Sequence, residues 1–551
     1  MGNCKLLSFL FVSVLSILAN TGIYAAQTVG LFLNTSASYN GYTLFAPMGS
    51  TKTYLINNCG EKVHTWASIY RPGLSVYLLE NGTLLRTANV NNTTFSPTGG
   101  VGGKIEMIDW NSNVIWSYTI SSNTECQHHD IKYLPNGNIL VVVWDSKTKA
   151  EAQLAGRTTS GTTLWSEKIM EIKPDLVNGG GTVVWEWKAW DHLVQDIDSE
   201  ANNFGSVSSS PQLININHYL NNPNVSDWMH VNSVDYNAKL DQIVISNHNF
   251  NEIWVIDHST TTAEAASHSG GKQNKGGDLL YRWGNPLAYK QGSTADRMLF
   301  LQHNANWIDD SYLDGGSIMV FNNQAGSNYS TVNSIETPVN TDGSYIFNGT
   351  TYAPSNFKWS YMATTPTDFY SNNISGAQRL PNGNTLICSG SKGQFFEVDH
   401  DGNMVWKYVS PVSVSGFIAQ GVTAANNLVF RAERYAPDFA GFTGKDLTSQ
   451  GLIETGSTYS CSVYTDINVV LKKENNISLR INLSENELTV SSPLEIKTAS
   501  IYNAMGQLIY LENPESNSFS INISKLNSGV YILNTLSTSN TRIAQKFTIQ
   551  K

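Results

Sequence analysis

The sequence predicts an all-β protein, built as a six-bladed β-propeller followed by a small C-terminal β-sandwich. Charged residues make up only 14% of the chain and aromatic residues 11%, and glycine occurs 43 times, which is typical of a turn-rich β protein. A chain of 551 residues is too long for one compact core unless that core is built from repeats. A two-part repeat runs through most of the chain, and its regular order favours a propeller over two separate β-sandwiches.

The first part of each repeat is an apolar run, a tight turn of the Asn-Gly type and a second apolar run. This order predicts a β-hairpin, because Asn and Gly readily adopt the backbone angles of such turns. In a propeller, these hairpins form the inner strands of the blades. The six predicted hairpins cover residues 76–87, 131–143, 233–246, 306–321, 377–389 and 423–432.

The second part is a strand or pair of strands that leads to a Trp or another aromatic residue. An early copy, residues 53–66, precedes the first hairpin and would supply the outer strands that are missing after the last hairpin. The N-terminal segment is therefore predicted to close the ring onto the last blade, which removes free sheet edges. The other five copies lie within residues 104–118, 168–187, 252–283, 357–361 and 395–408.

The two ends of the chain differ from the repeats. Lys5 is followed by an apolar run from Leu6 to Leu18 and then by Ala25 and Ala26, which predicts a cleavable secretory signal peptide. The run is too short to span a bilayer, and no other segment is apolar enough to do so. The predicted parts are the signal peptide (1–26), the propeller (27–465), a polar linker (466–478) and the sandwich (479–551).

Cysteine content and charge narrow the functional classes. After signal cleavage the exported chain keeps four cysteines, Cys59, Cys126, Cys388 and Cys461. They could form one or two disulfides, and four cysteines can be fully paired in three ways, between which the sequence does not decide. A formal net charge of -10 with no basic cluster argues against nucleic-acid binding, which needs a positively charged surface. We interpret the charge as a contribution to solubility.

Histidines precede three consecutive inner strands: His129 in QHHD, His230 in MHVNS and His303 in LQHNANW. Residues just before the inner strands of a propeller converge on one rim of the central channel, so these side chains are predicted to face one channel mouth. His248 in ISNHNF follows an inner strand and is expected on the same rim. A single histidine is more often a hydrogen-bonded structural residue, but the recurrence favours a site.

Five other histidines lie in predicted turns or outer strands and are interpreted as structural residues without a role in chemistry. These are His64, His192, His258, His268 and His400.

Three stretches near the C-terminus, IYNAMGQLIY (501–510), INISKLNSGVYILN (521–534) and the terminal QKFTIQK, resemble the sorting domain of the type IX secretion system of Bacteroidetes-type bacteria. The resemblance implies that the type IX machinery is a partner and that the protein is secreted or held at the cell surface.

The motif HVNSVDY (230–236) followed by ISNHN, the QH motif followed by VFNN, and HD before an NG hairpin together resemble the bacterial arylsulfotransferases. These enzymes move sulfuryl groups between phenols without a nucleotide donor. The resemblance extends over most of residues 40–465 and implies small aryl sulfate and phenolic substrates. No cofactor and no metal are expected.

The resemblance also implies roles for the site residues. His303, in the QH motif, corresponds to the histidine that is transiently sulfated. His129, His230 and Asn232 correspond to the residues that hold the sulfuryl oxygens. Imidazole suits the first role because it is a good nucleophile near neutral pH and can leave again.

Two positions depart from the family pattern. His248 stands where the family usually carries arginine, and Asn322 stands where aspartate is expected. His248 is expected to bind substrate, and it would have to be protonated to replace the charge of a guanidinium. Arg431 and Arg434 could supply that charge instead, although an ion pair with Glu433 or Asp438 is the favoured interpretation of both.

Two other functions remain open on the sequence alone. One is a non-enzymatic surface propeller whose Trp- and Asn-rich rim binds a glycan or a sulfated polymer. The other is a metal site, for which three imidazoles with an open position would suit zinc. Its ligands would be His128, His129, His230 and His303, with Cys126 or Asp130 nearby.

Overall fold

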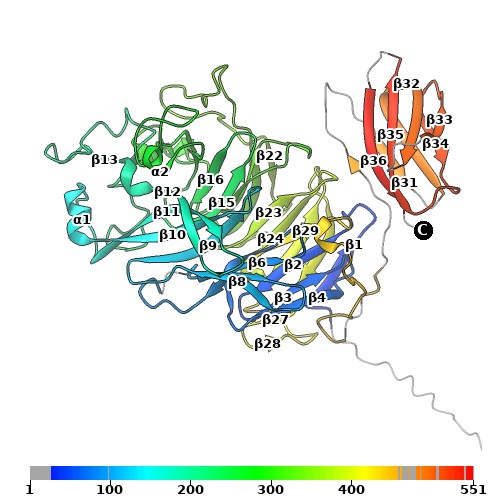
Figure 1. The fold of residues 1–551 in the computed structure, drawn as a ribbon, viewed down its shortest axis with the longest axis horizontal. Coiled ribbons are helices and arrows are strands. Elements are labelled where there is room, and N and C mark those ends of the chain that lie inside the picture. The colour runs from blue at the N-terminus through cyan, green and yellow to red at the C-terminus, as the bar shows by residue number, and fades with distance from the viewer. Residues whose placement is uncertain are drawn as a thin grey trace, which may run out of the picture.

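The computed structural model describes residues 26–96, 99–456, 459–461, 469–470, 480–483, 486–503, 508–538 and 542–549. The predicted signal peptide lies outside these residues except for Ala26. The predicted linker lies outside them except for residues 469–470. The described chain is all-β with many antiparallel sheets (Figure 1). None of the described helices is both long and apolar enough to cross a membrane.

Six antiparallel sheets make up residues 30–435, and three of them are formed by the first half of this region. The first has the order β29 (Val429–Tyr435), β2 (Tyr42–Pro47), β3 (Lys52–Ile56) and β4 (Lys62–Ala67). The second contains β5 (Pro72–Leu78), β6 (Leu84–Asn89), β7 (Gly103–Ile108) and β8 (Val114–Thr119). The third contains β9 (Glu125–Tyr133), β10 (Ile139–Thr148), β11 (Thr163–Pro174) and β12 (Gly181–Lys188).

The second half of the region forms the other three sheets. The fourth contains β15 (Val231–Asn237), β16 (Gln242–Asn247), β17 (Glu252–Asp257) and β18 (Tyr281–Trp283). The fifth contains β19 (His303–Trp307), β20 (Ile318–Gly326), β21 (Tyr329–Ile335) and β22 (Trp359–Tyr361). The sixth contains β23 (Gly376–Arg379), β24 (Thr385–Ser389), β25 (Gln394–Val398), β26 (Met404–Val409) and β1 (Gly30–Asn34).

Short elements occupy the connections. Two-stranded pairs are formed by β13 (Leu193–Val194) with β14 (Ile214–Asn215), and by β27 (Val412–Ser413) with β28 (Gly416–Phe417). The helices are α1 (Lys149–Leu154), α2 (Thr262–Ala265), η1 (Ala189–His192), η2 (Pro286–Tyr289), η3 (Thr294–Asp296), η4 (Pro366–Asp368), η5 (Gly390–Lys392) and η6 (Ala440–Phe442).

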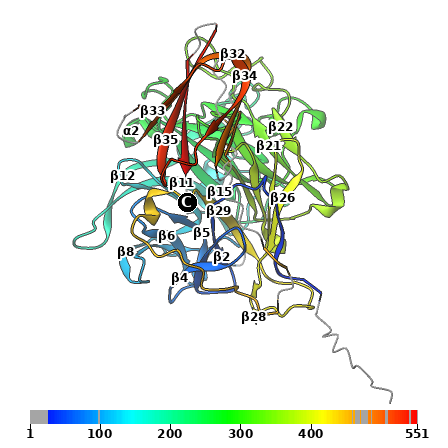
Figure 2. The same ribbon diagram turned by 90° about the vertical axis from the view of Figure 1, so that its right-hand side faces the viewer.

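Five of the six predicted inner hairpins form as expected, from β5–β6 to β23–β24. Their Asn-Gly turns depend on glycine, as at Gly137 (φ +86°) and Gly383 (φ +87°). The prediction for 423–432 was wrong, because residues 423–428 form no strand and β29 pairs with β2 from the N-terminal segment. Figures 1 and 2 show yellow β29 beside blue β2, so the two ends of this region meet in one sheet.

The innermost strands contact one another in a closed cycle. β5 contacts β9, β9 contacts β15, β15 contacts β19, β19 contacts β23, β23 contacts β29, and β29 contacts β5. Apolar side chains of neighbouring sheets form the cores between them. One such core joins Leu140 and Val142 of β10 to Ile243 and Ile245 of β16.

A tryptophan on the fourth strand of most sheets donates a hydrogen bond to the next sheet. In five cases the indole N–H reaches a backbone carbonyl just before the fourth strand of the neighbour, at 2.6–2.9 Å. The pairs are Trp116 to Gly180, Trp187 to Gly277, Trp283 to Pro354, Trp359 to His400 and Trp406 to Asn58. The last of these bonds joins the sixth sheet to the first and closes the cycle.

The sixth tryptophan of the series, Trp66 on β4, contacts its neighbour differently. Its ring packs edge-on against Trp110 of the second sheet, with centroids 5.1 Å apart. The six outer aromatic positions therefore all serve contacts between sheets, as the repeat indicates.

One disulfide joins Cys59, in the turn between β3 and β4, to Cys461, which lies 402 residues later. Cys126 and Cys388 are buried free thiols. The sequence analysis allowed one or two disulfides. The structure contains one, between Cys59 and Cys461, and leaves Cys126 and Cys388 reduced. This link ties the segment after the sixth sheet to the first sheet.

The C-terminal region forms a separate set of seven strands with its own apolar core. The strands are β30 (Val469–Val470), β31 (Arg480–Leu483), β32 (Glu487–Asn503), β33 (Leu508–Glu512), β34 (Ser516–Asn522), β35 (Gly529–Ser537) and β36 (Arg542–Ile549). The long strand β32 pairs with β31 and β34 near its start and with β33 and β35 near its end. β30 pairs with β31, so part of the predicted linker belongs to this sheet.

Replacing Trp406 by phenylalanine tests the bond that closes the cycle. The side chain is fully buried, so the change leaves the Asn58 carbonyl without its donor and should lower the free energy of unfolding by about 1–3 kcal/mol. Trp359→Phe is the matched control, since the same bond is solvent-exposed there and its loss should cost less than about 1 kcal/mol. Urea unfolding measures both losses, and equal losses would contradict the expectation that burial of the bond sets its contribution to stability.

Candidate active site

Four histidines form a continuous row at one end of the inner strands. His129 lies on β9, His230 directly precedes β15, His248 follows β16 and His303 begins β19. Their ring centroids are 4.5 Å apart for His129–His230, 5.0 Å for His230–His248 and 5.2 Å for His248–His303. The structure thus brings together the histidines that the sequence analysis selected.

Irregular backbone turns these side chains toward one another. His129 and His230 adopt left-handed conformations with φ of 50° and 56°, and the pairing of β9 with β10 and of β15 with β16 shifts register beside them. Such β-bulges redirect side chains and are common next to active sites. Gly100 packs against this row, because a Cβ there would lie 2.0 Å from the His129 ring, and its carbonyl accepts the His129 N–H. The sequence analysis did not select Gly100.

The tautomer of His303 is set by Asn323 on β20. The Asn323 amide group donates to the carbonyls of Ser371 and Ile374, both at 2.9 Å, so its Oδ1 must be the atom that faces His303. His303 Nδ1–H donates to this oxygen at 2.8 Å. The ring therefore presents the lone pair of Nε2. Asn322, the residue that departs from the family pattern, instead binds the backbone of Met298 and Phe300.

His248 is fixed in the same way by its neighbour Asn249. The amide group of Asn249 donates to the carbonyl of Asp227 at 2.9 Å, and its Oδ1 accepts from His248 Nδ1 at 2.7 Å. His248 therefore also presents an Nε2 lone pair. Burial, reinforced by His230, lowers the pKa of His248 to about 3, so the ring carries no charge near neutral pH.

His129 ends a buried chain of hydrogen bonds. Its Nδ1 lies 2.8 Å from Nδ1 of His128, and Nε2 of His128 lies 2.8 Å from Glu167. Burial raises the pKa of the Glu167 carboxyl well above its usual value and lowers that of His128 well below 6.5. When the Glu167 carboxyl carries a proton, it donates to His128, His128 donates to His129, and His129 Nε2–H points away as a donor.

His230 and Asn232 complete the row of predicted residues. His230 Nδ1 lies 2.5 Å from the Asp227 carboxylate. The buried Asn232 side chain donates to the Gln302 carbonyl at 2.8 Å, which uses one of its two amide N–H groups.

Burial also governs the charge of the remaining rings. The pKa values of His129 and His303 lie well below 6.5, first because both are buried and then because other histidines lie close by. Three of the four rings are thus neutral at physiological pH, and the requirement that His248 replace an arginine charge is not met.

The arginines of the FRAERY segment do not form the expected ion pairs with Glu433 or Asp438. Arg431, on the innermost strand β29, pairs with Asp130 at 2.8 Å, and Arg434 is buried with Glu397 at 3.3 Å. The expectation was wrong because β29 is an inner strand, which turns Arg431 toward the axis rather than toward an outer edge. Asp130 also accepts from Tyr77, so the charge of Arg431 is neutralised behind His129.

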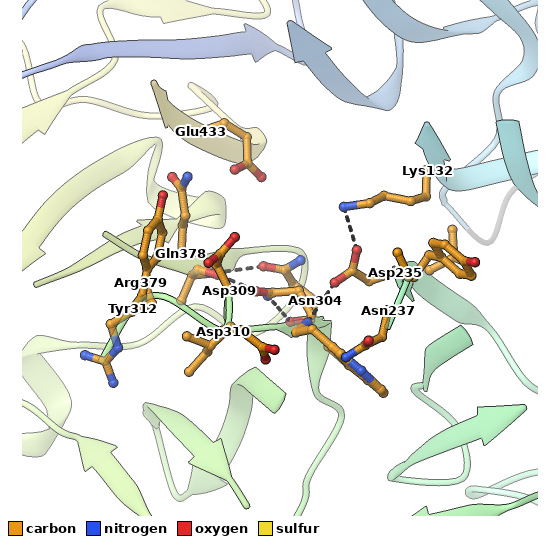
Figure 3. Close-up of a pocket in the computed structure, with 18 of the residues that line it drawn as sticks. Lys132, Asp235, Asn237, Asn304, Asp309, Asp310, Tyr312, Gln378, Arg379 and Glu433 are labelled. Atoms are coloured by element: carbon orange, nitrogen blue, oxygen red, sulfur yellow. Dashed lines mark hydrogen bonds and ion pairs between the residues drawn. The ribbon is translucent and has the colours of Figure 1, made fainter. Parts of the chain in front are cut away.

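A cavity of about 560 Å³ lies along the axis beyond Arg431 and Tyr77 (Figure 3). Lys132 and Asp235 form an ion pair at 2.6 Å on one side, and Glu433 points into the open space from the other. Burial raises the pKa of Glu433 to about 7. The histidine row does not line this cavity. The sequence analysis did not predict the cavity.

The alternative metal site finds no support in this geometry. Both ring nitrogens of His128 are occupied by His129 and Glu167. Over the ranges that the structure describes, the histidine row does not form a group whose ligand atoms all lie within 4.8 Å of one another.

Comparison with solved structures gives distant likenesses. A protein of unknown function from Bacteroides caccae is 13% identical over 72% of this chain and 98% of its own, with a TM-score of 0.38. A streptogramin B lyase is 12% identical over 75% of this chain and 95% of its own, with a TM-score of 0.34. These scores are too low to support a functional argument. No curated protein matches the chain.

Family models give a clear result for both parts of the chain. The model of the secretion system C-terminal sorting domain matches residues 476–550, which indicates export to the cell surface or secretion. The model described as arylsulfotransferase (ASST) matches residues 75–431 and includes the whole histidine row. The chain therefore belongs to the arylsulfotransferase family.

Proposed function

We propose that the protein moves a sulfuryl group from an aryl sulfate to a phenolic acceptor through a sulfohistidine formed on His303. The observation that carries this proposal is the hydrogen bond from His303 Nδ1 to Asn323, which leaves an Nε2 lone pair on a neutral ring. A neutral imidazole held in one tautomer is the form that attacks an electrophile.

The reaction has two steps that mirror each other. His303 Nε2 attacks the sulfur of the donor, the N–S bond forms, and the S–O bond to the aryl group breaks to release a phenolate. The oxygen of the acceptor then attacks the same sulfur, the N–S bond breaks, and the neutral imidazole is restored. Donor and acceptor therefore bind in turn, which gives ping-pong kinetics.

Hydrogen-bond donors beside His303 would stabilise the charge on the sulfuryl oxygens. Sulfuryl transfer resembles phosphoryl transfer, in which positioned donors supply much of the catalysis. We assign this role to His129 and Asn232, and to His230 in its protonated form, because the Asp227 carboxylate holds the Nδ1–H of His230 and only Nε2 remains to face the substrate. The chain from Glu167 through His128 supports the assignment of His129, because a protonated Glu167 leaves the proton of His129 on Nε2.

His248 takes a different part in this proposal from that of the arginine it replaces. Its Nε2 is an acceptor, so a neutral His248 cannot donate to a sulfuryl oxygen. It lies next to His303, with ring centroids 5.2 Å apart. We assign it to substrate binding as a hydrogen-bond acceptor for the phenolic O–H. Its lowered pKa makes it too weak a base to hold that proton, which passes to solvent as the acceptor attacks as a phenolate.

The proposal also covers the architecture of the chain and the boundaries of its parts. We infer that the six sheets are the blades of a six-bladed propeller within residues 27–465, because their inner strands form a closed cycle. We further infer that residues 479–551 form a β-sandwich with sorting function and that residues 1–26 are a signal peptide.

Intact-mass analysis after mixing with 4-nitrophenyl sulfate tests the covalent step. The wild-type protein should gain the mass of one sulfuryl group and release nitrophenol, whereas His303→Ala should do neither. His400→Ala is a control, because that exposed histidine is far from the row in sequence and its side chain serves no proposed step. A surface module that binds a glycan or sulfated polymer would form no adduct in any of the three proteins.

Asn323→Ala should slow sulfation of His303 by about 10²-fold or more, because the ring loses the acceptor that sets its tautomer. Asn333→Ala is the matched control, since Asn333 is also buried in the fifth sheet but binds Thr331 and Ser360. Rapid-quench mass spectrometry gives the rate, and thermal unfolding gives the stability of each variant. A similar slowing in both variants would indicate a general packing defect.

The rate of His303 sulfation should depend on pH in the same way in the wild-type protein and in His248→Gln from pH 5 to 8. Burial lowers the pKa of His248 to about 3, so this ring is already neutral at pH 5 and does not change charge over the range. Measuring the donor step alone keeps the ionisation of the phenolic acceptor out of the result. A fall in rate with rising pH that is lost in His248→Gln would instead indicate that a protonated His248 binds the sulfuryl group.

A further inference from the structure

A second cluster of chemically active side chains lies away from the histidine row, between the third and fourth sheets. His192 ends η1, directly after β12, and His268 and Asp278 lie in the connection from α2 to β18. Nδ1 of His192 is 2.9 Å from Oδ1 of Asp278, and Nδ1 of His268 is 2.7 Å from the same oxygen. The three ligand atoms all lie within 4.8 Å of one another.

The proton on His192 is placed by its surroundings. Nε2 of this fully buried ring lies 2.8 Å from the carbonyl of Ala265, which can only accept, so Nε2 carries a hydrogen. In the neutral ring, Nδ1 then directs a lone pair toward the carboxylate oxygen of Asp278, which is also an acceptor. Two such atoms at 2.9 Å require a proton or a cation between them.

A metal ion satisfies all three groups at once. Two imidazole nitrogens and one carboxylate oxygen are a ligand set that zinc-like divalent ions prefer, whereas calcium and magnesium prefer oxygen alone. The bond from His192 Nε2–H to a backbone carbonyl is the outer contact that metal-binding histidines usually make. Three protein ligands leave one tetrahedral position open.

The surroundings hold the cluster in place and leave it accessible. A Cβ at position 277 would lie 2.0 Å from the Ala265 carbonyl and 2.5 Å from the His192 ring, so Gly277 allows the two segments to approach. The carbonyl of Gly277 accepts the Trp187 indole bond that joins these sheets. His268 is 61% exposed and borders a cavity of about 640 Å³, through which an ion or a small ligand can reach it.

We propose that His192, His268 and Asp278 bind one zinc-class divalent ion, which cross-links the third and fourth sheets and keeps an exchangeable position facing solvent. The sequence analysis treated both histidines as structural residues because they lie in predicted turns or outer strands, and their separation of 76 positions matches no short metal-binding motif. This site is independent of the proposed sulfuryl transfer.

Metal titration of the mature full-length protein tests the site. After treatment with EDTA, calorimetry with ZnCl₂ should show one binding event, and Co²⁺ should give the visible absorption of a low-coordinate site that Zn²⁺ displaces. His268→Ala should weaken this binding more than about 10-fold. The exposed position of His268 makes misfolding of this variant improbable, and Asp278→Asn provides a second variant with nearly unchanged volume.

Two controls separate this site from other histidines. His303→Ala and His400→Ala should both keep the binding event, since neither residue belongs to the cluster. Absence of binding by the wild-type protein, or wild-type affinity in His268→Ala, would overturn the proposal and leave a metal-free His–Asp–His hydrogen-bond network. Loss of binding in His303→Ala would place the ion in the histidine row and would also overturn it.

Discussion

The hydrogen bond from an outer-strand tryptophan to the next sheet is the contact on which the rest of this structure depends. Each sheet has an apolar face that no other part of the same sheet can cover, so stability requires a neighbour on both sides. The indole fills the space between neighbours, and where the bond is buried, as at Trp187 and Trp406, it also satisfies a backbone carbonyl that would otherwise lack a donor. The bond from Trp406 to Asn58 closes the cycle, and the disulfide of Cys59 lies one residue away.

Closure of this cycle is what assembles the histidine row. Its four members come from the third, fourth and fifth sheets and are separated by up to 174 residues, yet consecutive rings lie within 5.2 Å of each other. No single sheet contains the row. Its geometry therefore depends on how the sheets are oriented around the axis, and the bulges in β9 and before β15 provide the final adjustment.

The site works with neutral groups where a fixed charge would be expected. Arg431 is close to the axis, but Asp130 and Tyr77 bind its guanidinium and keep it behind His129. Asn323 and Asn249 fix the tautomers of His303 and His248 without adding charge. In the proposed transfer the nucleophile is a neutral imidazole, and hydrogen-bond donors would meet the negative charge that the sulfuryl group carries. The amide partners therefore matter as much as the histidines that they orient.

The sequence by itself determined the local elements and the family of this protein. Asn-Gly turns and alternating apolar runs predicted five inner hairpins correctly, because hairpin formation depends on residues that are close in the chain. The motifs HVN, QH and HD, together with ISNHN, selected all four histidines of the row. Only the tertiary structure decided the partner of β29, the pairing of Cys59 with Cys461 and the direction of Arg431, since each depends on segments hundreds of residues apart. The tautomers and the lowered pKa values also depend on burial and on side-chain partners that the fold holds in place, and the meeting of His192 with Asp278 depends on contact between neighbouring sheets. Burial and tertiary contact have no signal in a local motif.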